Sequence, residues 1–62
     1  MTLFDISNED LFRWKNDLYR LVDIKDDTAT VVCVGRYNGL SIHYVEDGPE
    51  ENFNPFAQIE KP

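Results

Sequence analysis

Two side chains in this sequence could act as a nucleophile or general base near neutral pH: Cys33 and His43, each the only residue of its type. A histidine can transfer protons or bind a metal, and a thiolate can attack an electrophile. Cys33 lies within the apolar stretch 31–34, and apolar surroundings raise the pKa of a thiol and make it unreactive. A hairpin turning at Asn38-Gly39 would place residue 33 nearly opposite residue 44, with His43 on the other face. We therefore expect no catalytic residues, no metal site and no enzymatic activity.

Adjacent carboxylates are the next candidates, and they form three pairs: Asp26-Asp27, Glu46-Asp47 and Glu50-Glu51. General acid–base catalysis needs two carboxylates whose environments push their pKa values apart. All three pairs lie in turn-like, solvated sequence, where both members stay ionised. A calcium loop requires acids at alternate positions and glycine at the sixth, and the stretch 46–51 lacks that pattern. The sequence therefore predicts no cofactor.

The segment from Glu46 to Glu60 contains five acidic residues and no Lys or Arg. Two interpretations are open: a solvated connection, or a surface that contacts a basic partner. The whole chain has 6 Lys and Arg against 12 Asp and Glu, a net charge of -6. That charge disfavours nucleic acid and anionic membranes as ligands, and it favours a basic protein surface. The candidate partner-binding residues are acids of this segment and two nearby tyrosines: Glu46, Asp47, Glu50, Glu51, Tyr37 and Tyr44.

The elements that would position these residues depend on the stretch LFRWKNDLYRLVDI, Leu11 to Ile24. As a helix, it has one apolar face that Lys15 interrupts. As strands, it turns at Lys15-Asn16-Asp17 and returns through residues 18–24. Just before it, Ser7 and Asp10 have the spacing of a capping box, which predicts a short helical turn there.

The sequence after this stretch has β-strand character. Asp26-Asp27 predicts a turn, and residues 28–34 are rich in β-branched types, which suits a central strand. Asn38-Gly39 predicts a type I′ hairpin turn, and residues 40–45 alternate between apolar and polar types. Residues 57–60, which follow a proline-containing turn, fit an edge strand.

The segments Phe12 to Lys15, Leu18 to Ile24 and Asp26 to Val31 together resemble the opening of small SH3-like β-barrel proteins, often found in phages and other mobile elements. They share an aromatic pair, a tight turn, an apolar strand, an acidic turn and a β-branched strand. Most SH3-like openings have glycine in the first turn, where this chain has Asn16-Asp17. The resemblance covers about Leu11 to Val34.

We therefore predict a mainly β fold, a small five-stranded SH3-like barrel with a short N-terminal helical turn. The alternative is an α+β fold, in which an N-terminal helix packs on a three-stranded antiparallel sheet. Signalling SH3 domains bind Pro-rich peptides in an aromatic groove. Trp14, Tyr19, Tyr37 and Tyr44 could line such a groove here, although the aromatic doublet of those domains is missing and core packing also explains Trp14 and Tyr19.

Size and composition bound the remaining possibilities. A chain of 62 residues forms one domain, and its 42% hydrophobic and 13% aromatic content argues against disorder. One cysteine makes no internal disulfide, and the N-terminus lacks the basic and apolar regions of a signal peptide. We expect a single domain over residues 1–62, located in the cytoplasm.

Together these features predict a non-catalytic acidic protein-binding module. The resemblance suggests a phage or mobile-element accessory protein that binds a larger host protein and inhibits or redirects it, for example by mimicking nucleic acid. The alternative is a structural or assembly subunit that pairs through an exposed strand edge, including with copies of itself.

Overall fold

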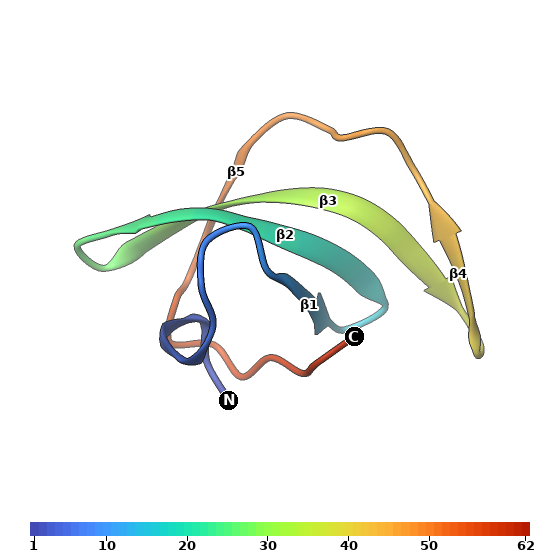
Figure 1. Ribbon diagram of the computed structural model, residues 1–62, viewed down its shortest axis with the longest axis horizontal. Coiled ribbons are helices and arrows are strands. Elements are labelled where there is room, and N and C mark those ends of the chain that lie inside the picture. Colours follow the sequence, from blue (N-terminus) through green and yellow to red (C-terminus); the bar gives the residue numbers. More distant parts are fainter.

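The computed structural model describes all residues, 1–62, and contains a curled antiparallel sheet of five strands (Figure 1). A single 3₁₀ turn, η1 (Leu3–Asp5), precedes the sheet. The strands are β1 (Leu11–Trp14), β2 (Asp17–Lys25), β3 (Thr28–Asn38), β4 (Ser41–Tyr44) and β5 (Glu51–Phe53). The prediction of a mainly β fold is thus confirmed.

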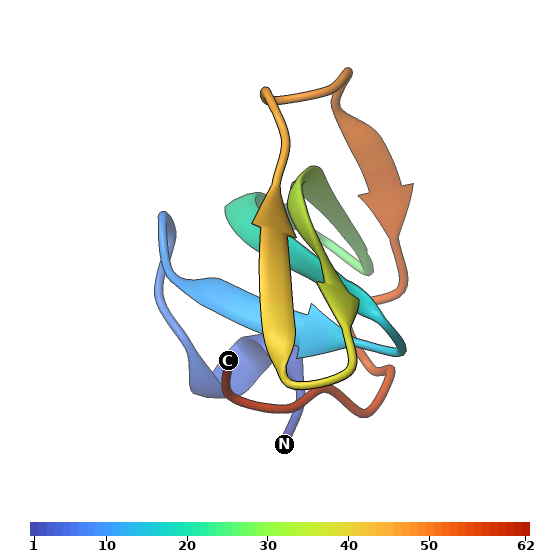
Figure 2. The same cartoon turned by 90° about the vertical axis from the view of Figure 1, so that its right-hand side faces the viewer.

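The longest strand, β3, organises the sheet. One of its edges pairs with β2, and β1 pairs with the far side of β2. The other edge of β3 pairs with β5 at Ala29 to Val31 and with β4 at Gly35 to Asn38. The connection between β4 and β5 arches over the end of the molecule opposite the two chain termini (Figures 1 and 2).

The stretch from Leu11 to Ile24 forms two strands, so the α+β alternative is wrong. Phe12 in β1 directly opposes Tyr19 in β2, and their rings stack with centroids 5.5 Å apart. Such cross-strand aromatic pairs stabilise a hairpin. In a helix, Phe12 and Tyr19 would lie about two turns apart and their rings could not stack. Lys15 adopts a positive φ of 56° in the turn, a backbone conformation that favours glycine. The guanidinium of Arg13 donates from Nε to the Lys15 carbonyl at 3.1 Å, which helps to hold that backbone conformation.

The core lies between the concave side of the sheet and the two terminal segments. A β-bulge in β2 shapes it, because the register shifts between Leu21 and Asp23 and leaves Val22 without a partner. Ile24 therefore points to the same side as Leu21 and packs against the core. The central cluster consists of seven buried residues: Leu3, Phe12, Tyr19, Leu21, Ala29, Val31 and Ile59.

The N-terminal helical turn lies earlier than predicted. Thr2 caps it: the Thr2 hydroxyl accepts from the Phe4 N–H, and Asp5 Oδ2 accepts from the Thr2 N–H at 2.8 Å. Asp10 Oδ2 does accept from the Ser7 N–H at 2.9 Å, but no helix follows the predicted cap at Ser7. No helix in the structure is long enough and apolar enough to cross a membrane.

The β3–β4 hairpin turns one residue later than predicted. Asn38 opposes Ser41, so the two-residue loop is Gly39-Leu40. Only Gly39 has a positive φ there, 64°, which is the requirement of a type II′ turn with glycine first. The predicted type I′ turn at Asn38-Gly39 is therefore wrong.

The final strand is β5, and the predicted edge strand over residues 57–60 is wrong. Of that segment, only Glu60 forms a bridge, which pairs it with Arg13 of β1. Ile59 contacts the N-terminal segment instead, and its N–H donates to the Met1 carbonyl at 2.8 Å. Pro55 is also buried, and its carbonyl accepts from the Leu3 N–H at 3.3 Å, which adds a second contact between the two terminal segments.

Candidate binding site

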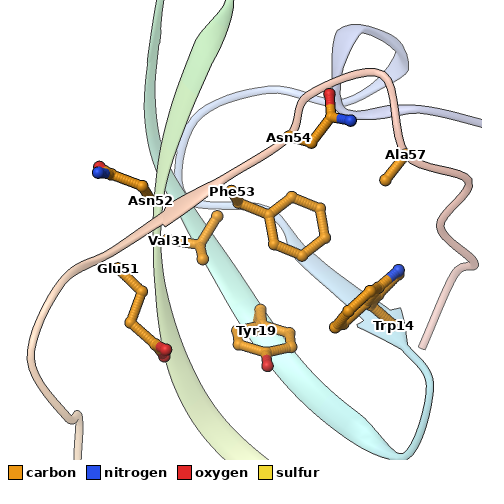
Figure 3. A pocket seen from close by; sticks show the side chains of 8 residues that line it. All are labelled: Trp14, Tyr19, Val31, Glu51, Asn52, Phe53, Asn54 and Ala57. Atoms are coloured by element: carbon orange, nitrogen blue, oxygen red, sulfur yellow. The ribbon is translucent and has the colours of Figure 1, made fainter.

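A hollow of about 280 Å³ opens between β1, β2 and β5. We name it the aromatic hollow, because three aromatic rings, those of Trp14, Tyr19 and Phe53, lie around it (Figure 3). Its full lining consists of eight residues: Trp14, Tyr19, Val31, Glu51, Asn52, Phe53, Asn54 and Ala57.

Phe53 stands at the centre of the aromatic wall. Its backbone is fixed by pairing with Ala29 of β3. Its ring meets Trp14 nearly edge-on, at a centroid distance of 5.1 Å and an interplanar angle of 85°. It also lies 5.5 Å from the ring of the buried Phe12 and 6.0 Å from that of Tyr19. Phe53 therefore joins the hydrophobic core to the hollow, with aromatic contacts that hold its ring in place.

The Tyr19 hydroxyl lies beside the hollow and contacts a carboxylate. The hydroxyl donates to Asp17 Oδ2 at 3.4 Å. Burial raises the pKa of Tyr19 to about 12, and the neighbouring Asp17, Cys33 and Glu51 add to this rise. No Lys or Arg side chain lines the hollow, so Glu51 is the only charged residue in its lining.

Four residues that oppose one another on adjacent strands form a line across the sheet next to the hollow. The register places Trp14 opposite Asp17, Asp17 opposite Arg36, and Arg36 opposite His43. Arg36 Nε donates to Asp17 Oδ1 at 3.3 Å, and this ion pair offsets part of the Asp17 charge. Glu51 belongs to none of the three ion pairs in the structure, so its charge is not offset within the chain.

The predicted acidic surface is divided between the β4–β5 connection and the hollow. Asp47 is already paired, because its Oδ2 accepts from Arg20 Nη2 at 2.8 Å. This hydrogen bond raises the pKa of Arg20. Glu46 and Glu50 are exposed and form no ion pair, whereas Glu51 lines the hollow. Three of the four predicted acids are thus free to meet a partner.

The two candidate tyrosines lie outside the hollow. Tyr37 is half-buried beneath Arg13, whose Cζ lies 4.1 Å from the ring centroid. The Tyr37 hydroxyl is buried and has no hydrogen-bond partner within the chain. Tyr44, at the end of β4, is 66% exposed. Of the four aromatic residues considered for a peptide groove, the structure brings together only Trp14 and Tyr19.

Cys33 and His43 do not form a dyad. Cys33 is half-buried, packs against the core and donates from Sγ to the Gly35 carbonyl at 3.4 Å. His43 is exposed on β4, opposite Arg36. Because the hairpin turns later than predicted, Tyr44 opposes Gly35, and the expected alignment of residue 33 with residue 44 is wrong by two residues. The His, Cys, Asp and Glu side chains form no group of three or more that could hold a metal ion.

The sequence did not reveal that β5 completes the hollow. Asn52, Phe53 and Asn54 follow an acidic run and precede Pro55, so this stretch resembles a loop. The strand within it has only three residues, which is too short for an alternation pattern to identify it. The one available signal was Phe53, a large apolar residue in an otherwise polar segment.

Comparisons of the chain with protein-family models, with curated proteins and with solved structures found no match. The functional conclusion therefore depends on the geometry and charge of the site itself.

Proposed function

We propose that this chain is a non-catalytic acidic module that binds a basic surface on a larger protein. The aromatic hollow carries this proposal. The half-buried rings of Trp14 and Phe53 offer rigid contact area of the kind enriched in protein interfaces, and Glu51 adds a carboxylate that is not neutralised within the chain. The exposed Glu46 and Glu50 extend the negative surface along the β4–β5 connection.

For the fold we propose an SH3-like barrel, of which the curled sheet forms the wall. The strand order β1-β2-β3-β4, with β5 returning to β3, supports this proposal. So does the pairing of Arg13 with Glu60, whose N–H groups each donate to the other residue's carbonyl, at 2.8 Å and 2.9 Å. This pairing covers part of the free edge of β1, and barrels remove free edges by such closure.

Within this class we propose the role of an inhibitory accessory protein of a phage or mobile element. Its acidic surface would occupy a basic cleft that otherwise holds nucleic acid. The net charge of -6 on 62 residues supports this role, because it provides electrostatic attraction to such a cleft. Inhibition of this kind needs only occupancy of the cleft and no chemistry.

The experiment is capture of partners from lysate on the immobilised protein, at about 50 mM and about 300 mM salt, because salt screens exposed charge pairs. One variant removes the three unpaired charges of the proposed surface: Glu46→Gln, Glu50→Gln and Glu51→Gln. A control variant removes three charges elsewhere: Asp26→Asn, Asp27→Asn and Glu60→Gln. The proposal expects a stoichiometric partner that is lost at high salt and lost by the first variant, but retained by the control. Equal binding by the two variants would contradict it.

The free edge of β4 favours a second candidate function, which is assembly through strand pairing. β4 pairs only with β3, so its other edge is unpaired along Ser41 to Tyr44. It carries neither Lys nor Pro, the residues that commonly block pairing at an edge. Light scattering tests this function: a mass that rises with protein concentration would support it, and a constant monomer mass would contradict it.

A further inference from the structure

We propose that the aromatic hollow receives the guanidinium group of an arginine side chain presented by the partner. This inference rests on the proposed function and names the chemical group that the site recognises. It depends on the size of the hollow, on the arrangement of its rings and on the single carboxylate in its lining.

The hollow is large enough to receive one side chain. Its volume of about 280 Å³ lies below the range of about 300–1,000 Å³ that is typical of pockets for drug-sized ligands. Trp14 and Phe53 meet at 85°, so their rings form a corner with nearly perpendicular walls. Tyr19 lies on a third side (Figure 3). A flat group can stack on one wall while its edge faces the next.

The charge of the hollow complements a cation. Glu51 is the only charged lining residue, and its carboxylate lies on the same side as the Tyr19 hydroxyl (Figure 3). The other nearby carboxylate, that of Asp17, is engaged by Arg36 and by the Tyr19 hydroxyl. A cation that enters the hollow would meet ring faces and an unneutralised carboxylate together.

Arginine fits this arrangement better than lysine. A planar guanidinium stacks on aromatic rings, binds a carboxylate through two N–H groups and is more weakly hydrated than an ammonium group. The chain itself contains one such contact, between Arg13 and Tyr37. The Lys15 ammonium lies 4.4 Å from the centroid of the Trp14 ring, but Lys15 does not line the hollow and so leaves its interior open.

The test titrates the whole isotope-labelled chain with N-acetyl-arginine amide and follows the amide and indole resonances by NMR. The indole N–H of Trp14, the only tryptophan, reports directly on the hollow. We expect saturable shifts at Trp14, Tyr19, Glu51 and Phe53. N-acetyl-citrulline amide has nearly the same shape without the charge, and it should bind about fivefold more weakly. N-acetyl-lysine amide should also bind more weakly than the arginine probe.

A pair of matched variants links the binding to Glu51. Glu51→Gln should weaken binding of the arginine probe about threefold to fivefold, as expected for a partly exposed charge pair. Glu60→Gln makes the same chemical change at an exposed position outside the hollow and should leave binding unchanged. Both side chains are exposed, so both variants should keep the wild-type amide spectrum away from the substituted site. The proposal is overturned by equal binding of arginine and citrulline, by the lack of saturable shifts, or by full binding in Glu51→Gln.

Failure of this inference is distinguishable from failure of the proposed function. If the probe does not bind but a partner is captured in a salt-sensitive manner, the arginine site is wrong and the binding function stands. If the probe binds as described but no partner is captured, the arginine site is supported and the proposed function is contradicted.

Discussion

Replacing Phe53 with alanine should lower the free energy of unfolding by about 2–3 kcal/mol. Removal of a fully buried phenylalanine side chain costs about 3–5 kcal/mol. Phe53 is only half-buried, so we expect a cost at or just below the lower end of that range, although its ring contacts three other rings at 5.1 to 6.0 Å. A domain of this length has a total stability of about 3–9 kcal/mol. The variant should therefore lose a large share of its stability.

Urea unfolding followed by Trp14 fluorescence measures this loss. In thermal unfolding, the melting temperature should fall by about 10–20 °C. Phe56→Ala is the matched control, because the Phe56 ring is 62% exposed and its one aromatic contact is with Phe4, at 5.1 Å. We expect the control to cost about 1 kcal/mol or less. If the two variants cost the same, Phe53 does not join the core to the hollow and the reasoning is refuted.

The remaining predictions concern two glycines and Tyr19. Gly35→Ala should destabilise the fold by about 1 kcal/mol in urea unfolding, because the added Cβ would lie 3.3 Å from Ile42 Cγ2. The control Gly48→Ala should be near neutral, because open space surrounds Gly48. Equal effects of the two substitutions would contradict the close packing at Gly35. Gly39→Ala should cost about 1 kcal/mol in the same assay, because Gly39 adopts a φ of 64°, and a neutral result would argue against the type II′ turn. Tyr19 has a pKa of about 12 in the folded chain, against about 10 when unfolded. The folded state therefore holds the Tyr19 proton more tightly than the unfolded state does. The resulting contribution to the free energy of unfolding is fully present below pH of about 10 and is lost as the pH rises toward 12. In a titration followed by tyrosinate absorbance, the wild type should show one tyrosine that ionises at higher pH than the others. This last ionisation step should be missing in Tyr19→Phe. Its persistence in the variant would contradict the assignment to Tyr19.

Local sequence predicted the second turn, but it left the first one open between a hairpin turn and a continuing helix. Lys15-Asn16-Asp17 and Asp26-Asp27 both stand between apolar alternating stretches, and the chain reverses at both. Turn-forming polar residues between strand-like segments act locally, so a single sequence reveals them. The β-branched run from residue 28 to residue 34 similarly predicted the start of β3, which continues to Asn38.

The register of the β3–β4 hairpin needed tertiary information. Asn38-Gly39 is a strong local signal, yet the loop is Gly39-Leu40. With this register Ile42 packs against Gly35, where a Cβ would stand only 3.3 Å from Ile42 Cγ2. The fit between these two residues depends on contacts across the sheet, which alternation along one strand does not reveal.

The aromatic hollow could not be predicted for the same reason. Trp14, Tyr19 and Phe53 come from three different strands, and β5 has only three residues. The pairing of β5 with β3 places the Phe53 ring against rings from β1 and β2, at centroid distances of 5.1 to 6.0 Å. The sequence nevertheless pointed to Glu51, the charged residue of the hollow, as a candidate partner-binding residue.

The central claim is that the chain binds a basic surface through Glu51 in the aromatic hollow and the exposed Glu46 and Glu50 of the β4–β5 connection. The most direct test is the affinity for the captured partner as a function of salt, measured by calorimetry for the wild type and for the variant with Glu46→Gln, Glu50→Gln and Glu51→Gln. We expect the wild-type affinity to fall steeply with salt, and the variant to bind more weakly and with a shallower salt dependence. Equal affinities with the same salt dependence would contradict the claim.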